Sequence, residues 1–504
     1  MWRQFKEWLR RLWSRQKGEG TVPWDNQTQA IAENKWEKLN KILQQHSYML
    51  AEAEEAQRRY DGDYDILRRE KKRLDDPNHR IVTNYARMIV NMKVNYMLGK
   101  PVSYDVPKSI DGVLEEVLSQ FEEDLRAVME ENDDEAVTFE AVRDGLIARV
   151  ATVLFYWQDG EIRYRSYTLN ECIPVVDASG ELVQAIHRYK DEEKEYIEIY
   201  DSRTVTYLVR DGDGFMLDDR YGVNPAVHYL PIVPAAIFIN GKPARPHFCK
   251  IAHGVSELGP DIRTLLEEYS RIISDNANRM DVFCDPYILM RGAQITRDEM
   301  LEMRQARAIR TDDPSSEVSY LEWSQESSGV DSHADRILDT IFEVSSTPKI
   351  YKQEAAGALS SVAIRQLYTP LDNAVNEKEV WLNKFIRRKL MIITLMLNAK
   401  YALAEGKEPE TYERYDWRWV DWRTNRNLPQ NLKEEIETLL QLKGTISDFT
   451  LLQNIPFVEN AEDEMDRIRQ EKLDTPRVNL KDITGHLDNQ NDRMKKRSMN
   501  DDAL

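Results

Sequence analysis

The chain has 504 residues, of which 69 are Lys or Arg and 88 are Asp or Glu, so its formal net charge is −19. With this excess of acidic residues, the surface as a whole does not attract nucleic acid. The content of 41% hydrophobic residues excludes a wholly disordered chain. Three cysteines (Cys172, Cys249 and Cys284) are too few for a disulfide framework and favour a reducing, intracellular setting. We expect no membrane span, because the longest apolar stretches fall far short of about 20 residues, and no signal peptide.

The first 17 residues have a basic amphipathic pattern. One helical face carries the apolar side chains Trp2, Phe5, Leu9, Leu12 and Trp13, and arginines and lysines surround it. The pattern fits a helix that packs on its own protein or a neighbour. It also fits an arm that lies on a membrane surface or on nucleic acid.

Helices are predicted for the segment that follows, over residues 25–60, 80–98 and 110–132, with another ending near 148. Gly99 should stop the second of these helices, since Pro101 prevents its continuation. Aromatic and β-branched runs between turn signals then predict an antiparallel meander over about 151–240. The Pro-rich stretch LPIVPAAIFINGKPARP is interpreted as the linker that closes this meander.

The second half of the chain is predicted to be helical again. An amphipathic helix reaches about Val282, and a small strand–helix–strand unit follows over 287–323. A helix over 330–344 precedes a small-residue loop and then one very long helix over 362–405, with a kink at Pro370. Residues 414–422 alternate as a strand would, with Tyr415, Trp417 and Trp419 on one face. The last predicted helices cover 432–443, 447–453 and 461–473, before a polar tail.

Signatures of enzymes and metal sites are lacking in the sequence. It has no P-loop, H-E-x-x-H, C-x-x-C, G-x-S-x-G or G-x-G-x-x-G motif. His247, Cys249 and His253 lie close together, but their spacing matches no standard site, so a structural loop is the better interpretation. We therefore predict a protein that is not an enzyme and has no cofactor and no metal.

The most informative feature is a row of four carboxylates at i, i+4 spacing, Asp331, Asp335, Asp339 and Glu343. At about 100° per residue they form one ridge of the helix, here called the acidic ridge, while Val330, Ile337, Ile341 and Val344 lie roughly opposite. Like charges at this spacing cost a few tenths of a kcal/mol each, so helix stability alone does not select them. The ridge is either an ordinary solvated face or a surface that faces DNA without adhering to it.

The loop after this helix contains two cations, Lys349 and Lys352, among small residues. It is either a plain connector between helices or a segment that touches a phosphate backbone transiently.

The order of elements resembles that of the portal, or head–tail connector, proteins of tailed double-stranded DNA bacteriophages, in the branch with roughly 500-residue subunits. Five segments carry the likeness: NYARMIVNMKVNYMLGKPVSY, the meander that begins ATVLFYWQDGEIRY, SELGPDIRTLLEEYSRIISDNANRMD, ALSSVAIRQLYTPL and LKGTISDFTLLQNIPFVENAEDEMDRI. They are similar to the wing helix, the wing sheet, the first stem helix, the start of the spine helix and the helical crown of that family. The resemblance covers about residues 25–473, and the order and spacing of the segments are more specific than any one of them.

This resemblance implies an α+β, mainly helical subunit of portal type. Its expected parts are a basic N-terminal segment, wing, first stem helix, clip, second stem helix, tunnel loop, long kinked spine helix with a return strand, helical crown and C-terminal tail. The N-terminal segment would cover residues 1–24, the wing 25–254, the first stem helix 255–283 and the clip 284–325. The second stem helix would cover 326–346, the tunnel loop 347–361 and the spine helix with its return strand 362–428. The crown would cover 429–473 and the tail 474–504.

The resemblance also implies a function for several residues. About twelve subunits would form a ring at one capsid vertex, around a channel for double-stranded DNA. The acidic ridge would line this channel, and four carboxylates per subunit would give roughly 48 in the ring. Lys349, Lys352 and Gln353 would belong to the tunnel loop. The clip would present a partner-binding surface with Arg297, Asp298, Glu302, Arg304, Arg307 and Arg310.

The implied partners are the terminase large subunit, a head–tail adaptor, and the major capsid and scaffolding proteins. The implied location is the virion, after assembly in the host cytoplasm, without stable membrane insertion. Two alternatives from other classes remain. One is a metal-dependent nuclease or another acid-cluster hydrolase of a mobile element, and the other is a membrane-associated structural protein that uses its N-terminal amphipathic helix.

Overall fold

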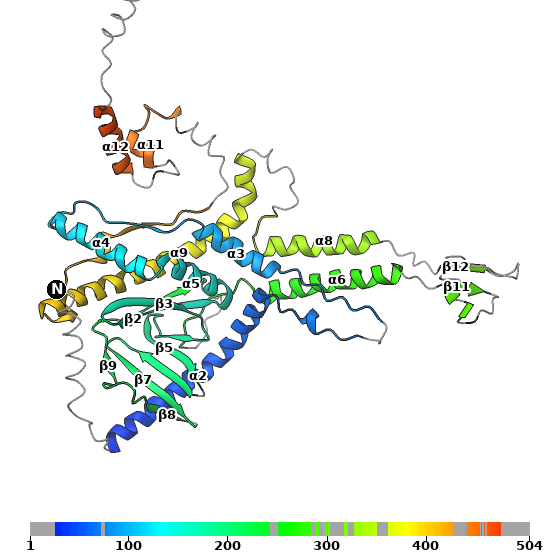
Figure 1. Cartoon of the computed structure of the whole chain (residues 1–504), viewed down its shortest axis with the longest axis horizontal. Coiled ribbons are helices and arrows are strands. Elements are labelled where there is room, and N and C mark those ends of the chain that lie inside the picture. Colours follow the sequence, from blue (N-terminus) through cyan, green and yellow to red (C-terminus); the bar gives the residue numbers. More distant parts are fainter. Residues whose placement is uncertain are drawn as a thin grey trace, which may run out of the picture. The chain divides into compact units, whose positions relative to one another are not determined.

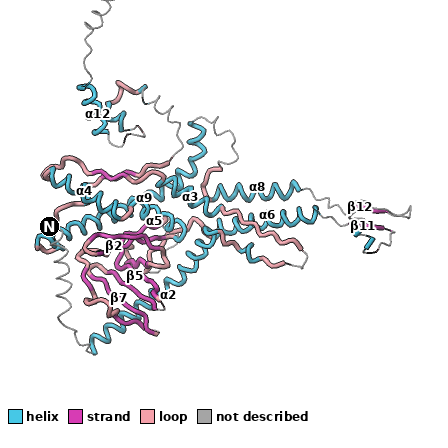
Figure 2. Tube along the Cα trace, in the orientation of Figure 1, coloured by secondary structure: helices cyan, strands magenta, loops and turns pink. Residues whose placement is uncertain are grey.

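The computed structural model describes residues 26–71, 76–192, 194–212, 214–241, 250–284, 288–291, 296, 298–299, 301–302, 317–320, 327–349, 361–427, 439, 441–453, 455, 458 and 461–474. Helices predominate and strands form separate sheets, so the predicted α+β class is confirmed (Figures 1 and 2). These residues belong to two compact units. The first runs from α2 (Asn26–Asp61) to β13 (Asp421–Arg423), and the second contains α11 (Asp448–Gln453), α12 (Ala461–Asp474) and the first residues of α9 (Ser361–Glu405).

The N-terminal helices of the first unit follow the predicted order. They are α2, the 3-10 turn η1 (Asp65–Arg68), α3 (Tyr85–Leu98), α4 (Glu115–Glu131) and α5 (Asp134–Ala148). The N-terminal segment 1–24, which the sequence predicts to be an amphipathic helix, lies outside the described residues.

Helix α3 begins five residues later than predicted, because Asn84 caps it and its Oδ1 accepts the Arg87 N–H at 3.1 Å. Gly99 follows its last residue in a right-handed conformation, with φ −69°, so the glycine is not needed for a left-handed turn. A Cβ at this position would overlap the Asn95 carbonyl oxygen and would lie 2.7 Å from Asn427 Nδ2. Close approach of the Asn95 backbone and the Asn427 side chain therefore accounts for the glycine.

The predicted meander is divided between two sheets. In the three-stranded sheet, β2 (Val150–Gln158) pairs with β3 (Glu161–Tyr167) on one side and with β10 (Ala235–Ile239) on the other. The β2–β3 turn has positive φ at Asp159 and Gly160, 53° and 82°, as a tight two-residue hairpin requires.

The larger sheet has the strand order β4-β5-β6-β7-β8, with β9 (Ala226–Val227) paired to β7. Its other strands are β4 (Cys172–Val176), β5 (Leu182–Asp191), β6 (Lys194–Tyr200), β7 (Thr204–Asp211) and β8 (Gly214–Leu217). One face packs on α2, with Leu39 and Ile42 against Ile197, Leu208 and Phe215. Side chains of the other face, Tyr200 and Val205, pack with Leu154 and Ala235 of the three-stranded sheet. The core of this part of the first unit is therefore a helix and two sheets in layers (Figure 1).

Two sequence interpretations were wrong. The Pro-rich stretch after residue 230 is not only a linker, because Ala235–Ile239 forms β10 and pairs with β2. Pro231 and Pro234 precede the strand, and the strand residues Ala235, Ala236 and Phe238 are buried. Residues 414–422 are not one strand either. Trp417–Trp419 is a 3-10 turn, and only Asp421–Arg423 forms a strand, which pairs with β1 (Ser103–Asp105).

A pair of long helices and a very long third helix complete the first unit. Helix α6 (Pro260–Cys284) and helix α8 (Ser327–Val344) lie side by side and antiparallel (Figure 1). Between them in the sequence, β11 (Ile288–Arg291) and β12 (Glu317–Tyr320) form an antiparallel pair. Helix α9 contains Pro370 and bends towards its N-terminal end (Figure 1). In the second unit, the expected helix over 432–443 lies largely outside the described residues.

Candidate functional site

Helix α8 is held against its neighbours by a buried side that the sequence identified only in part. The buried residues are Ala334, Leu338, Ile341 and Phe342, and Tyr85 of α3 contacts Phe342 edge to face, with ring centroids 5.9 Å apart. Tyr85 also packs edge to face on Tyr269 of α6, at 5.6 Å. These aromatic contacts join α3, α6 and α8 at one end of the helix pair.

The predicted apolar face of α8 was therefore partly wrong. Only Ile341 is fully buried, Val330 and Ile337 are half-buried, and Val344 is 47% exposed. The buried direction is shifted because α8 packs on two partners, α6 and the aromatic end of α3, rather than on one.

All four carboxylates of the acidic ridge are exposed on α8. Asp331 accepts a hydrogen bond from Asn276 Nδ2 of α6 at 3.4 Å, and Asp339 contacts the ammonium group of Lys349. Arg336 is exposed on the same helix. With four carboxylates and the two cations Arg336 and Lys349, this surface has a smaller negative charge than the carboxylates alone suggest.

The turn after α8 explains how Lys349 reaches the ridge. The Thr347 N–H donates to the Phe342 carbonyl at 3.0 Å and the Ser346 N–H to the Glu343 carbonyl at 3.1 Å. Ser346 has a φ of 54°, so a serine occupies the left-handed position that glycine usually fills in this helix-ending motif. Lys349 Nζ then lies 5.9 Å from the centroid of the Phe342 ring. Lys352 and Gln353 lie outside the described residues.

The residues expected to form the partner-binding clip are described only in part. Asp298 and Glu302 are exposed, whereas Arg297, Arg304, Arg307 and Arg310 lie outside the described residues. The Thr296 N–H donates to Glu299 Oε2 at 2.8 Å, which is the pattern of a capped helix start.

A buried charge cluster at the base of α6 was missed by sequence reasoning. Glu257 accepts from Lys378 Nζ of α9 at 2.5 Å and from Asn240 Nδ2 at 2.8 Å, and it also contacts the ammonium group of Lys93 on α3. Burial alone would raise the pKa of Glu257, but the two lysines outweigh burial and lower it to about 2. The signal in the sequence was a lysine inside the apolar face of a helix, at Lys93.

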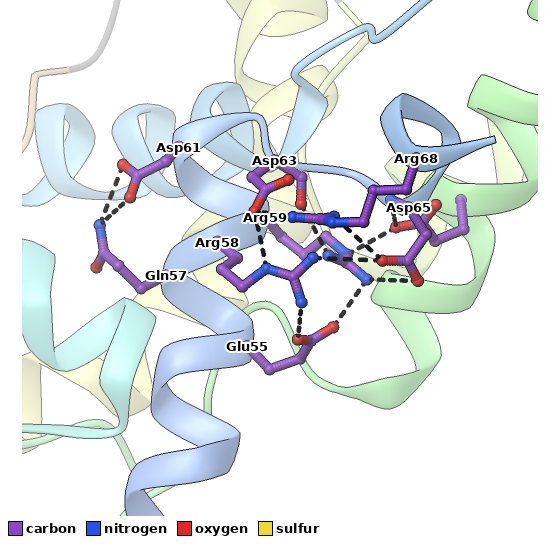
Figure 3. A network of polar contacts seen from close by, with 9 residues as sticks. Glu55, Gln57, Arg58, Arg59, Asp61, Asp63, Asp65 and Arg68 are labelled. Carbon is purple, nitrogen blue, oxygen red and sulfur yellow. Dashed lines mark hydrogen bonds and ion pairs between the residues drawn. The ribbon is translucent and has the colours of Figure 1, made fainter. Parts of the chain in front are cut away.

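A second polar network lies at the end of α2 and in η1 (Figure 3), and Arg59 links it to α6. Arg59 is 2% exposed and pairs with Glu55 and with Glu267 of α6, both at 2.8 Å. Next to it, Asp63 accepts from Arg58 Nε at 2.9 Å (Figure 3). The cavity of about 940 Å³ beside this network is lined by charges of both signs. The Arg59–Glu267 pair therefore links α6 to α2.

The described residues hold no group of three or more His, Cys, Asp and Glu side chains that could bind a metal ion. Of the three residues considered for a metal, His247 and Cys249 lie outside the described part, and His253 Nδ1 lies 3.2 Å from the Ile251 carbonyl oxygen. Within the described part of the chain, no helix has the length and apolar character to cross a bilayer.

The architecture is that of a mainly helical α+β subunit with a long antiparallel helix pair and an exposed acidic ridge. The family model described as "Phage portal protein, SPP1 Gp6-like" matches residues 39–475. The chain belongs to this family of phage portal proteins, and the resemblance inferred from the sequence is confirmed.

Two solved structures contain chains similar to this one. "Neck of empty GTA particle computed with C6 symmetry" matches with 10% identity and a TM-score of 0.42, over 75% of this chain and 88% of that chain. "Virion of native gene transfer agent (GTA) particle" matches with 11% identity and a TM-score of 0.40, over 72% of this chain and 87% of that chain. No curated protein sequence matches the chain.

Proposed function

We propose that about twelve copies of this portal-family chain close into a ring whose α8 helices face an axial channel for double-stranded DNA. When two different surfaces of the same chain bind each other, the copies close into a ring if the rotation from one copy to the next is a whole fraction of 360°. The acidic ridge lines the channel wall and repels phosphates, so that DNA slides during packaging and ejection with few adhesive contacts.

The observation that carries this proposal is the exposure of Asp331, Asp335, Asp339 and Glu343 on a helix whose other side is buried. Counted with Arg336 and Lys349, four carboxylates less two cations leave two negative charges per subunit. A ring of about twelve would present about 24 net charges, half of the number that the carboxylates alone give.

The ring sits at one vertex of the virion capsid and acts as a conduit without an enzymatic step of its own. The clip, with Asp298 and Glu302 exposed, docks the terminase large subunit during packaging and a head–tail adaptor afterwards. Major capsid and scaffolding proteins surround the ring while it assembles in the host cytoplasm. The tunnel-loop cations, Lys349 and Lys352, touch the DNA backbone weakly and in a salt-dependent way.

Negative-stain microscopy of the purified full chain tests this function. We expect rings with a central hole, and light scattering in the mass range of about twelve subunits. Monomers and dimers alone at micromolar concentration would contradict the proposal. A divalent-cation-dependent nuclease activity that is lost with one carboxylate pair would favour the hydrolase alternative. Flotation with vesicles that requires residues 1–17 would favour the membrane alternative.

A further inference from the structure

A short backbone segment joins α6 to the rest of the first unit. The Glu257 N–H donates to the Leu146 carbonyl of α5 at 2.9 Å, and the Val255 N–H donates to the Asn240 carbonyl at 2.7 Å. Gly254 lies so close to its neighbours that a Cβ there would be 2.6 Å from the Asn240 carbonyl oxygen. The chain just before α6 is thus held on α5 and on the residue that follows β10.

The Glu257 side chain connects this segment to two further helices. Its carboxylate accepts from Lys378 Nζ of α9 at 2.5 Å and contacts the ammonium group of Lys93 on α3. Asn240 Nδ2 donates to the same carboxylate at 2.8 Å, and Asn240 Oδ1 accepts from Lys378 Nζ at 3.2 Å. The side chains of Lys93, Glu257 and Lys378 are 4%, 10% and 12% exposed. Lys93, Asn240, Glu257 and Lys378 therefore form one buried group at the start of α6, here called the joint cluster.

Burial makes the joint cluster selective for one orientation of α6. A buried charge without its partner is costly, so a tilt of α6 that separates Glu257 from either lysine is penalised. Apolar side chains in the same place would pack at several orientations, because burial of apolar surface has no required direction. The joint cluster therefore contributes one defined angle rather than additional stability.

Small changes in this angle matter because α6 is long. Its 25 residues span about 37 Å, so a tilt of about 5° at the joint cluster moves the far end of the helix by about 3 Å. Successive copies are related by about 30° in a ring of twelve and by about 28° in a ring of thirteen. A change of about 2° between copies is thus enough to alter their number.

We infer that the joint cluster fixes the angle between α6 and the sheet-bearing part of the first unit, and thereby the number of copies that close the ring. The inference rests on the proposed ring. In a closed ring α6 and the sheet-bearing part both have to meet the next copy at the same rotation. One fixed angle between them allows one rotation, whereas a variable angle allows several.

Replacement of the charges by apolar side chains tests this role. The triple variant Lys93→Met, Glu257→Leu and Lys378→Met removes all three charges together, so no buried charge loses its partner and the chain should fold. Native mass spectrometry measures the number of copies in each ring. We expect rings that differ from the main copy number to become roughly tenfold more abundant than in the wild type.

A single variant keeps the test decisive if the triple variant does not fold. Lys378→Met removes only the link to α9 and leaves Glu257 with Lys93 and Asn240. It should broaden the copy numbers in the same direction as the triple variant. Urea titrations show which variants fold and how far their stabilities differ.

The matched control replaces a buried ion pair elsewhere in the first unit. Lys389 of α9 pairs with Asp134 of α5, and Lys389→Met with Asp134→Asn should leave the copy numbers as in the wild type. Equal broadening in this control and in Lys378→Met, or unchanged copy numbers in every joint variant that folds, would overturn the inference while leaving the ring intact. Absence of rings from the wild-type chain would instead overturn the proposed function, and this inference with it.

Discussion

Lys349, the fifth residue after α8, contacts the carboxylate of Asp339 on that helix. The first cation of the expected tunnel loop is thus paired with the acidic ridge beside it. Any phosphate that Lys349 touches has to compete with Asp339 for the ammonium group.

Replacing Asp339 by Asn should release Lys349. An exposed ion pair contributes up to about 1 kcal/mol, so we expect a small amine-reactive ester to modify Lys349 up to about fivefold faster in the variant. Quantitative peptide mass spectrometry measures the rate. Asp331→Asn is the control, because Asp331 contacts Asn276 rather than Lys349. Equal labelling of Lys349 in both variants would show that the contact does not hold the loop.

Reversing the charge at the centre of the exposed face should impair DNA passage. Asp339 and Glu343 are exposed, so changing both to Lys should leave folding intact. Packaging should stall because the lysines bind phosphate and release counterions. Changing both to Gln removes repulsion without adding attraction and should have a milder effect. Nuclease-protected DNA per particle is the measurement, and normal packaging by the double Lys variant would contradict the channel.

Charge reversal in the proposed clip should weaken motor docking more than ring assembly. We expect Asp298→Lys with Glu302→Lys to reduce capture of the terminase large subunit by assembled rings, because both side chains are exposed. Glu410→Lys, on the 3-10 turn η3 (Pro409–Thr411), is the control. If the clip variant loses its rings to the same extent as its binding, the clip is mainly a seam between subunits.

Glu257 should make the protein sensitive to acid. Its pKa in the folded chain, about 2, lies below the ordinary value of 4.5, so folding favours the ionised carboxylate. The resulting stabilisation is fully present above about pH 4.5 and is lost as the pH falls towards 2. We expect Glu257→Gln to unfold more readily at pH 7, by about 3 kcal/mol, and to show a flatter acid limb. Urea titrations at several pH values measure both effects, and the exposed Glu408→Gln should match the wild type.

Lys389 and Asp134 should form a second pair on which the fold depends. Lys389 Nζ lies 2.7 Å from Asp134 Oδ2, and the lysine side chain is 0% exposed. Lys389→Met leaves the carboxylate buried without its cation and should cost about 3–5 kcal/mol. Lys384→Met, an exposed lysine on the same helix, is the control for thermal unfolding. Adding Asp134→Asn should cost less than the sum of the single changes; simple additivity would indicate that the two residues act independently.

Hydrophobic periodicity and turn residues determined most of the local structure. The long helices α2, α6, α8 and α9 follow from apolar residues at helical spacing, although α9 contains Pro370, and the β2–β3 hairpin follows from Asp159 and Gly160. The i, i+4 spacing alone placed the four ridge carboxylates on one side of α8, and the structure leaves all four exposed. These features depend on neighbours in the sequence, so one chain suffices to predict them.

Tertiary contacts decided what local patterns could not. Ala235–Ile239 forms a strand because its backbone pairs with the edge of β2. Trp417–Trp419 forms a 3-10 turn, although its sequence alternates as a strand would. The buried side of α8 was set by α6 and Tyr85 together. Glu257 met Lys93 and Lys378 from distant parts of the chain. Such contacts join residues far apart in the sequence, and burial and charge pairing act through space, so only the folded chain reveals them.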